Sequence, residues 1–167
     1  RLLPLLVRIL REDGQVITGV FERNDAALRE KEGLQAYKAW FPLEGEALPA
    51  SPVTEITENG IRYLVDVENG QKTGFFLDQK YNRQAVARLA RGKTVLDCFT
   101  HTGSFALNAA RGGAVHVTAV DVSESAVEMA RANALRNGLS DRVECVCANV
   151  FDLLPALEQQ PRKYDFI

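Results

Sequence analysis

Apolar residues follow two different spacings between residues 80 and 167. Val86, Leu89 and Ala90 recur at the spacing of one helix face. We expect this helix to begin near Lys80 and to end at Gly92. Short apolar runs between turn signals are typical of strands, and they occupy residues 94–98, 114–120, 142–147 and 164–167. Further helices are expected over residues 104–111, 123–137 and 151–159. Strands that alternate with helices predict a parallel sheet with helices on both faces, here in the strand order 3-2-1-4.

The first 70 residues have a different pattern. The alternating run 15–21 (QVITGVF) and the run 61–67 (IRYLVDV) each predict a strand. Asn24 can cap a helix that ends before Gly33, and the prolines and glycines within 40–60 are typical of turns and short extended pieces. We therefore expect an α/β chain with two parts, a small α/β domain over residues 1–70 and a Rossmann-like domain over residues 71–167.

Composition places the chain among ordinary globular proteins. Hydrophobic residues make up 46% and charged residues 25% of the 167 positions, which excludes a disordered or collagen-like chain. No apolar run approaches the ~18 residues needed to cross a membrane. Three cysteines cannot all pair within one chain, so we expect reduced thiols and a cytoplasmic location.

Charge is spread unevenly along the chain. Residues 71–93 carry six basic side chains and one acidic side chain, whereas the segments on either side are acidic. This basic band can face a polyanion, and the alternative is an ordinary solvated helix face. Because the whole chain has a net charge of −2, we expect it to bind nucleic acid only weakly by itself.

The strand at 94–98 ends in an acid and leads through a short loop into a helix. Asp97 lies at the strand end, Gly103 in the loop, and the helix begins near Ser104. In such folds ligands bind at the carboxyl ends of the strands, where a glycine lets the backbone approach and the helix N–H groups face the ligand. One glycine in place of G-x-G-x-x-G argues against a pyrophosphate and suits S-adenosylmethionine, whose amino group Asp97 would hold directly or through a water. The alternative is an ordinary strand-to-helix turn.

Two further strand ends carry polar side chains. Asp121 ends the next strand, 24 residues after Asp97, where an acid accepts hydrogen bonds from ribose hydroxyls. A capping role for Asp121 is the alternative, although Ser123 is already placed to cap the following helix. Asn149 closes the third strand and can pair with the adenine edge, with Val122 and the pair Val150-Phe151 as apolar neighbours. For Asn149, a plain helix N-cap is the alternative.

The cysteines and histidines do not form a metal or nucleophile pattern. Cys145 and Cys147 alternate on one strand and are interpreted as small buried side chains, since no further Cys or His accompanies them. Cys98 is expected to pack, because no base is evident to activate it. His101 lies in the loop and can touch a ligand, whereas His116 lies on a different element.

The run 72–83 (KTGFFLDQKYNR), followed by VLDCFTHTGSF at 95–105, resembles the class I S-adenosylmethionine-dependent methyltransferases of the large-subunit ribosomal RNA cytosine-C5 type. Residues further upstream resemble the sequence of that family's central domain: Phe21–Asp25, Arg29 and Glu32–Leu34. The resemblance implies an N-terminal RNA-binding PUA domain, a small central α/β domain and a Rossmann-like methyltransferase domain. On this basis the chain is a fragment, holding the central domain and the first half of the catalytic domain.

The resemblance also assigns roles to single residues. The family's Asp-Pro-Pro motif and its nucleophilic cysteine are expected beyond Ile167, so no catalytic residue is assigned within the chain. Arg83 or Lys80 can meet the cofactor carboxylate or an RNA phosphate, and Phe76 can pack on the cofactor, with a core position as the alternative for Phe75 and Phe76. The family usually has Asp at the adenine position that Asn149 occupies. The full set of cofactor-binding residues implied is Thr73, Phe76, Asp78, Gln79, Arg83, Asp97, Phe99, Thr100, Thr102, Gly103, Asp121, Val122 and Asn149.

The expected activity is therefore S-adenosylmethionine-dependent methylation of ribosomal RNA by the parent protein. Methylation of another base or of a protein is the rival within the same class, and a non-catalytic nucleotide- or RNA-binding module is the rival outside it. A sheet cut at Ile167 would expose an unpaired strand edge, so residues 1–167 alone are expected to self-associate and to transfer no methyl group.

Overall fold

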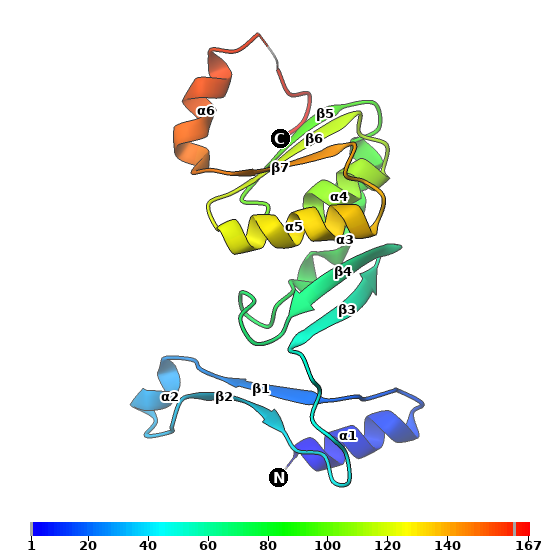
Figure 1. Ribbon diagram of the computed structural model, residues 1–167, viewed down its shortest axis with the longest axis vertical. Helices are drawn as coiled ribbons and strands as arrows, with labels where there is room; N and C mark the ends of the chain where they lie inside the picture. The colour runs from blue at the N-terminus through cyan, green and yellow to red at the C-terminus, as the bar shows by residue number, and fades with distance from the viewer. Residues whose placement is uncertain (1, 162) are drawn as a thin grey trace. The chain divides into compact units, whose positions relative to one another are not determined.

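The computed structural model describes residues 2–161 and 163–167 (Figure 1). The chain divides into two compact units. Unit 1 comprises Arg1–Thr54 and Val65–Phe75, and unit 2 comprises Glu55–Leu64 and Phe76–Ile167. In the part that the structure describes, no helix is long and apolar enough to cross a membrane.

Unit 1 is built on a two-stranded antiparallel ribbon. Its strands β1 (Val20–Asn24) and β2 (Tyr37–Phe41) are separated by the short helix α2 (Leu28–Lys31), and helix α1 (Leu3–Glu12) precedes them. The Phe21 ring meets the Trp40 ring edge-on, with 5.0 Å between the centroids. Such cross-strand aromatic pairs help to stabilise a sheet of only two strands.

Unit 1 differs from the sequence-based expectation. The strand predicted over 15–21 begins only at Val20, because Val20 pairs with the last residue of β2 and the next residue, Pro42, has no N–H to continue the ladder. Asn24 does not cap a helix, since it lies inside β1 opposite Tyr37. The sequence analysis also missed helix α1 and strand β2.

A hairpin of β3 (Val53–Glu58) and β4 (Ile61–Asp66) replaces part of the turn-rich region expected over 40–60. Its two turn residues, Asn59 and Gly60, have φ values of 54° and 73°, as tight hairpin turns require. Residues 55–64 belong to unit 2, where the side-chain oxygen of Asn133 accepts the backbone N–H of Leu64 at 2.8 Å. The sequence analysis expected one domain to end at residue 70 and the next to begin at residue 71. In the structure each unit is instead made of two separate segments of the chain.

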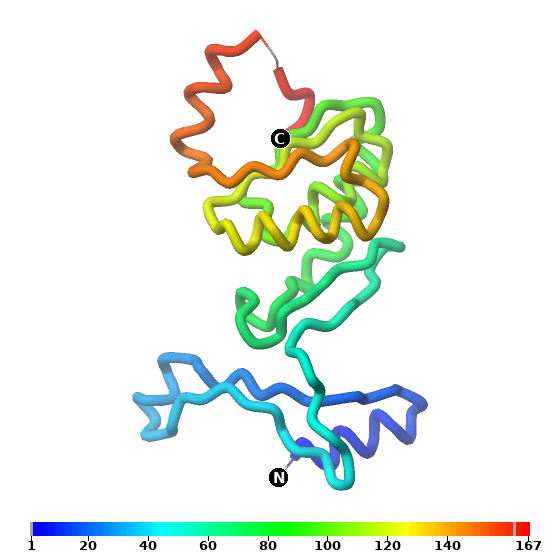
Figure 2. The backbone as a smooth tube through the Cα atoms, viewed as in Figure 1, coloured from blue at the N-terminus to red at the C-terminus, as the bar shows by residue number. Residues whose placement is uncertain are grey.

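Unit 2 contains a parallel sheet of β5 (Thr94–Cys98), β6 (His116–Asp121) and β7 (Val143–Cys147) in the order β5-β6-β7. A parallel bridge joins Phe166 to Val95 of β5, so the predicted order 3-2-1-4 is confirmed. Figure 2 shows the chain returning from α6 to place its last residues beside β5. The other elements of unit 2 are η1 (Leu77–Gln79), α3 (Lys80–Leu89), α4 (Ser104–Arg111), α5 (Glu124–Arg136) and α6 (Val150–Glu158).

Helices cover both faces of this sheet, as expected (Figure 1). On one face α4 and α5 pack through small side chains, with Ala106, Ala109 and Ala130 fully buried. On the other face Leu96 and Val120 pack with residues of α6. Parallel strands buried on both faces are typical of a Rossmann-like fold, so the α/β prediction is confirmed. This packing fixes the carboxyl ends of the three strands at one edge of the sheet.

Candidate cofactor site

The candidate site lies at the carboxyl edge of the sheet in unit 2, where the loops after β5, β6 and β7 meet. The backbone N–H of Thr100 donates to the carbonyl of Val120 at 2.9 Å, and the N–H of Ala148 donates to the carbonyl of Asp121 at 2.9 Å. These two bonds tie each loop to the end of the neighbouring strand. Ligands of doubly wound folds bind at this edge.

Asp97 is held at the end of β5 by the loop and helix that follow it. Its Oδ2 accepts the hydroxyl of Thr100 at 2.5 Å and the backbone N–H of Ala106 at 2.9 Å. Because both bonds fall on Oδ2, Oδ1 retains its lone pairs for another donor. A cavity of about 240 Å³ is bordered by Asp97 and otherwise by apolar residues, which include Val86 and Phe105. Asp97 supplies a carboxylate to this otherwise apolar wall.

Burial raises the pKa of Asp97 to about 6, and the nearby charge of Asp121 adds to the effect. The hydrogen bonds from Thr100 and Ala106 oppose the increase, since they stabilise the charged form. Asp97 is therefore ionised at neutral pH at a cost in free energy. A bound cation would remove that cost, which makes Asp97 suited to a positively charged ligand group.

The loop after β5 has a strained backbone that neighbouring groups hold in place. Phe99 and His101 have φ values of 60° and 52°, which non-glycine residues seldom adopt. The backbone N–H of His101 donates to Oδ2 of Asp121 at 2.8 Å. Such strain is concentrated at functional sites and persists only where the surroundings impose it.

Asp121 has a double role at the end of β6. Its Oδ2 accepts from His101, and its Oδ1 accepts the backbone N–H of Ser123 at 3.0 Å. The side chain is partly exposed, and each carboxylate oxygen can accept a further bond, so hydroxyl groups of a ligand can still bind. Ser123 caps α5, as predicted, since its Oγ accepts the N–H of Ala126 at 3.3 Å.

Gly103 has a packing role that the sequence analysis did not predict. It has φ of +83°, and a Cβ at this position would lie 3.0 Å from the Cβ of Ala130 in α5. The expectation was that a missing side chain lets a ligand approach the backbone. In the structure, Gly103 permits the left-handed turn before α4 and the close packing of α4 against α5.

We expect Gly103→Ala to lower the free energy of unfolding by about 1–2 kcal/mol from the left-handed conformation, and by more through crowding against Ala130. Gly138→Ala is the matched control, because Gly138 has φ of +64° with no atom within 4 Å of the added Cβ. Denaturant unfolding of both variants measures the two costs. Equal stability of Gly103→Ala and the unchanged protein would contradict the packing role.

Three large apolar side chains stand exposed around these acids. Phe99 is 59% exposed, Val122 71% and Phe151 73%, and the rings of Phe99 and Phe151 lie 5.7 Å apart. An exposed apolar surface of this kind suits a flat aromatic ligand. Phe151, two positions after Asn149, was predicted as an apolar neighbour of the adenine position but was not included in the set of cofactor-binding residues. Its neighbour Val150 is buried in the core.

Asn149 is the N-cap of α6. Its Oδ1 accepts the backbone N–H of Phe151 at 3.0 Å. The capping alternative is therefore confirmed for Asn149, while its amide nitrogen can still donate to a ring nitrogen of a ligand.

The segment 72–83 is divided between the two units. Thr73 is exposed in unit 1, and Phe75 is buried there, as the core alternative predicted. In unit 2 the ring of Phe76 meets the ring of His101 edge-on, with 5.6 Å between the centroids. Asp78 accepts a bond from its neighbour Gln79 at 2.8 Å.

Arg83 does not lie where the sequence analysis expected it. A free guanidinium was expected to meet a carboxylate or a phosphate, but Arg83 is only 1% exposed. Its Nε donates to Oε1 of Glu58 at 2.7 Å. The buried partner, 25 positions earlier on the hairpin, draws Arg83 into the interior, so we remove it from the set of direct ligand contacts.

The cysteines do not resemble activated nucleophiles. Burial raises the pKa of Cys98 and Cys145, and the charge of Asp97 raises both further. A reactive cysteine needs the opposite shift. The prediction that Cys147 is buried was wrong, since its side chain is exposed, with Sγ 3.6 Å from the carbonyl of Val122. Over residues 2–161 and 163–167, no group of three or more acidic, Cys or His side chains is placed to hold a metal ion.

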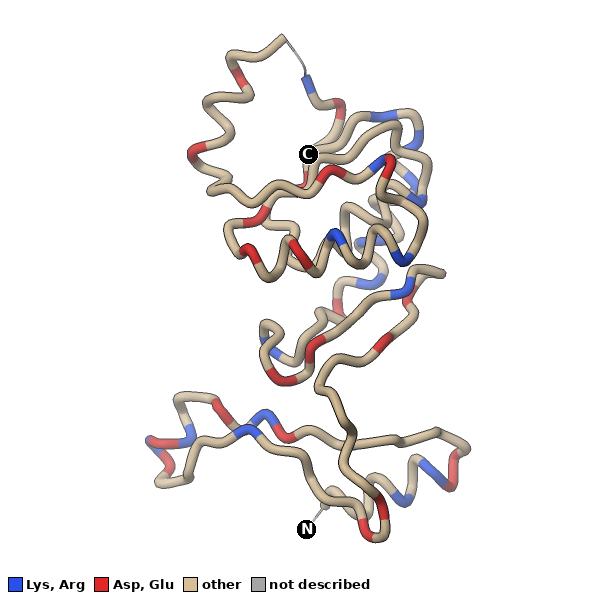
Figure 3. The backbone as a smooth tube through the Cα atoms, viewed as in Figure 1, with Lys and Arg blue, Asp and Glu red and all other residues tan. Residues whose placement is uncertain are grey.

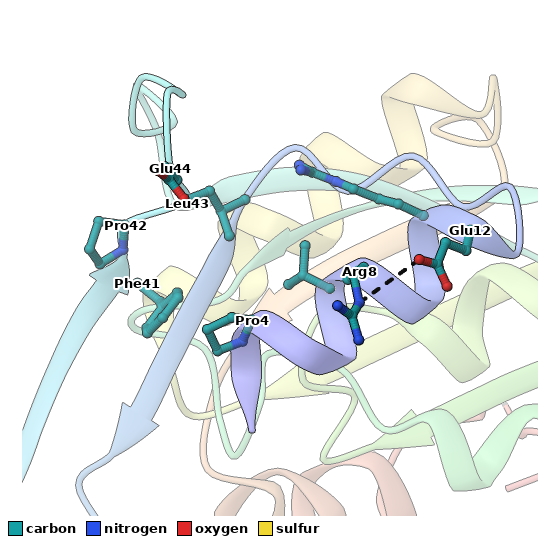
Figure 4. A pocket seen from close by; sticks show the side chains of 9 residues that line it. Pro4, Arg8, Glu12, Phe41, Pro42, Leu43 and Glu44 are labelled. Atoms are coloured by element: carbon teal, nitrogen blue, oxygen red, sulfur yellow. Dashed lines mark ion pairs between the residues drawn. The ribbon is translucent and has the colours of Figure 1, made fainter. Parts of the chain in front are cut away.

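A larger cavity, of about 570 Å³, lies in unit 1 between α1 and the segment after β2 (Figure 4). It is lined by apolar side chains, including Val7 and Phe41, and by the exposed ion pair of Arg8 and Glu12 at 3.8 Å. None of the predicted cofactor residues borders it. Size alone therefore does not identify the candidate site.

Comparison with known proteins agrees with this geometry. A family model described as S-adenosylmethionine-dependent methyltransferase matches residues 31–166. Ribosomal RNA large subunit methyltransferase I of Aeromonas salmonicida is 45% identical over 149 residues, which are 89% of this chain and 37% of that protein. The protein of the same name from Shewanella denitrificans is 46% identical over 149 residues, 89% of this chain and 36% of that protein.

Solved structures give the same result. A Streptococcus mutans protein assigned to the SAM-dependent methyltransferases has a TM-score of 0.74 at 30% identity, over 96% of this chain and 40% of that one. A protein assigned to the methyltransferases and complexed with SAH matches with the same TM-score and identity, over 96% and 39%. The chain thus spans about two fifths of the length of these relatives. The residues at the sheet edge have the chemistry that S-adenosylmethionine needs: two carboxylates can accept from ammonium and hydroxyl groups, and an exposed apolar surface suits a flat ring. The chain belongs to the S-adenosylmethionine-dependent methyltransferase family, and its cofactor is S-adenosylmethionine.

Proposed function

We propose that this chain is the cofactor-binding part of an enzyme that methylates C5 of a cytosine in large-subunit ribosomal RNA. The observation that carries the proposal is the 45% identity to a ribosomal RNA large subunit methyltransferase over 149 residues. The residue pattern of 72–83 and 95–105 supports the cytosine-C5 type through its resemblance to that family. The substrate is accordingly an RNA base.

The proposed cofactor contacts follow the geometry of the sheet edge. Asp121 accepts the ribose hydroxyls, and Asp97 accepts the ammonium group of the methionine part. Adenine lies among Phe99, Val122 and Phe151. The remaining proposed contacts come from the loop, from the capping amide and from the segment before α3: Thr73, Phe76, Asp78, Gln79, Thr100, Thr102, Gly103 and Asn149.

Methylation at C5 needs a nucleophile as well as a bound methyl donor, and we assign these two roles to different parts of the enzyme. C5 of cytosine is made reactive when a thiolate adds to C6, and this step needs a cysteine with a lowered pKa. Cys98 and Cys145 have raised pKa values, which disfavours the thiolate, so we assign the nucleophile to another part of the protein. The residues of this chain bind and orient the methyl donor.

A contact with RNA phosphates is proposed at the end of α3. Residues 79–120 carry six Lys or Arg side chains and one acid, Asp97 (Figure 3). Arg88 and Arg91 are exposed, and no ion pair is recorded for either among the described residues. Arg88 lies in the last turn of α3, where a cation also stabilises the helix dipole, but Arg91 lies beyond the helix.

We expect Arg88→Gln/Arg91→Gln to weaken RNA binding and to reduce the slope of log affinity against log salt by about 1.4–1.8, since each lost phosphate contact removes about 0.7–0.9. The matched control is Arg8→Gln/Lys31→Gln, which removes two exposed cations that have acidic neighbours, Glu12 and Glu30. Filter binding to large-subunit ribosomal RNA over a salt series measures the slope. Equal slopes for both double variants would contradict a contact at α3.

The proposed function is tested by methyl transfer from labelled S-adenosylmethionine to unmodified large-subunit ribosomal RNA, using the whole enzyme. We expect 5-methylcytidine after nuclease digestion and mass spectrometry. Methylation of another base or of a protein would overturn the cytosine-C5 assignment and leave the family intact. SAH binding without any transfer would favour the non-catalytic binding module.

A further inference from the structure

We propose that Arg83 is a positioning residue for the cofactor loop, acting from the interior through the backbone of Phe76. Residues 99–103 form this loop, and its conformation governs where the proposed cofactor contacts lie. The proposal goes beyond family membership, because it assigns a role to a buried ion pair that touches no ligand. It rests on the cofactor site proposed above.

Arg83 is held in one orientation by three hydrogen bonds. Its Nε and Nη2 donate to the two carboxylate oxygens of Glu58, at 2.7 and 3.1 Å. Nη2 also donates to the backbone carbonyl of Phe76 at 2.7 Å. Glu58 is 8% exposed and Arg83 is 1% exposed, so solvent screens these bonds little.

Stability alone is a weak explanation for this arrangement. Apolar side chains of similar size often stabilise an interior as well as a buried ion pair does, since desolvating two charges is costly. An apolar pair, however, could not donate to the carbonyl of Phe76. The forked pair with Glu58 fixes the guanidinium plane, and the fixed plane aims Nη2 at that carbonyl.

The effect passes from Phe76 to the loop through ring packing. The Phe76 ring meets the ring of His101 edge-on at 5.6 Å, and His101 is one of the two non-glycine loop residues with positive φ. The backbone N–H of His101 donates to Asp121 at 2.8 Å. Fixing Phe76 therefore favours the strained conformation in which this hydrogen bond forms.

A second contact leads from Arg83 toward Asp97. The guanidinium carbon lies 5.8 Å from the centre of the Phe105 ring. Phe105 borders the cavity of about 240 Å³ that also reaches Asp97. One buried cation thus contacts Phe105, which borders the cavity with Asp97, and Phe76, whose ring meets His101.

The test separates positioning from stability by means of a paired variant. Arg83→Met alone leaves Glu58 charged, buried and unpaired, and we expect a strong loss of thermal stability. Glu58→Gln/Arg83→Met removes both charges, and we expect it to recover most of that loss. It still lacks the Arg83 donor to the carbonyl of Phe76, which leaves that carbonyl with the weaker bond from the N–H of Gln79 at 3.3 Å, so we expect the loop to remain loose.

Hydrogen exchange of the His101 amide in the protein without ligand is the direct readout. We expect exchange at least tenfold faster in the double variant, with the amide of Val120 in β6 unchanged as the internal control. Titration with SAH should show affinity about three- to tenfold weaker. Unchanged exchange at His101 in the double variant would overturn the proposal, whether or not SAH binds. Fast exchange together with no SAH binding by the unchanged protein would overturn the cofactor site instead.

Phe76→Leu provides a second test that leaves the ion pair in place. The variant keeps an apolar side chain but loses the ring edge that meets His101. We expect faster exchange of the His101 amide and weaker SAH binding at nearly unchanged thermal stability. Exchange and affinity equal to those of the unchanged protein would overturn the role of Phe76, and with it the proposal.

Discussion

Asp121→Ala should reduce the affinity for SAH by about 10- to 100-fold, because hydrogen bonds to a charged group contribute roughly 1.5–3 kcal/mol. Two effects combine in this loss. The variant removes the acceptor proposed for the ribose hydroxyls, and it removes the acceptor of the His101 N–H. The fold should persist, since Asp121 is partly exposed at the end of β6.

Calorimetric titration with SAH measures the affinity of Asp121→Ala, and circular dichroism confirms that the variant is folded. Ser123→Ala is the matched control, because Ser123 caps α5 beside Asp121 without a proposed contact to the ligand. We expect the control to lose about 0.5–2 kcal/mol of stability and little affinity. A folded Asp121→Ala with unchanged affinity would remove Asp121 from the site.

Cofactor binding should weaken as the pH falls through about 6, the pKa of Asp97. The ammonium group of the ligand needs the charged carboxylate, so each unit of pH below the pKa should cost about tenfold in affinity. Titrations with SAH between pH 5 and 8 measure the profile. Asp97→Asn should bind more weakly at neutral pH and show a flat profile over this range.

Protonation of Asp97 has the opposite effect on folding: it stabilises the folded protein, whereas it weakens cofactor binding. The pKa of Asp97 in the folded protein, about 6, exceeds its ordinary value of 3.8, so the folded state holds the proton more tightly than the unfolded state does. The resulting stabilisation is fully present below pH 3.8 and is lost as the pH rises through about 6.

An SAH affinity that stays constant across pH 6 in the unchanged protein would contradict the predicted contact between the ligand and Asp97.

Unit 2 could be predicted from its sequence because local patterns and tertiary packing agree there. Each strand of the sheet is an apolar run, and α5 has its own start and stop signals, Ser123 and Gly138. In unit 1 the pairing partner decides the outcome. The β-branched residues of 15–19 have the strand pattern but lie beyond the end of β2, so they form no ladder.

The acids of the site could be predicted because strand ends meet at one edge of a parallel sheet. Asp97 and Asp121 lie there, as expected from the position of each at the end of its strand. Arg83 could not be placed, since its partner Glu58 comes from a hairpin 25 residues away. The role of Gly103 also depends on a distant residue, Ala130. Local spacing contains no information on such pairs.

The most direct test of the cofactor site is a crystal structure of this protein with SAH bound. We predict that the ribose hydroxyls lie within about 2.7–3.2 Å of the carboxylate of Asp121, with the amino group at Asp97 and the adenine ring among Phe99, Val122 and Phe151. SAH bound elsewhere, for example in the larger cavity between α1 and the segment after β2, with the carboxyl edge of the sheet empty, would contradict the account.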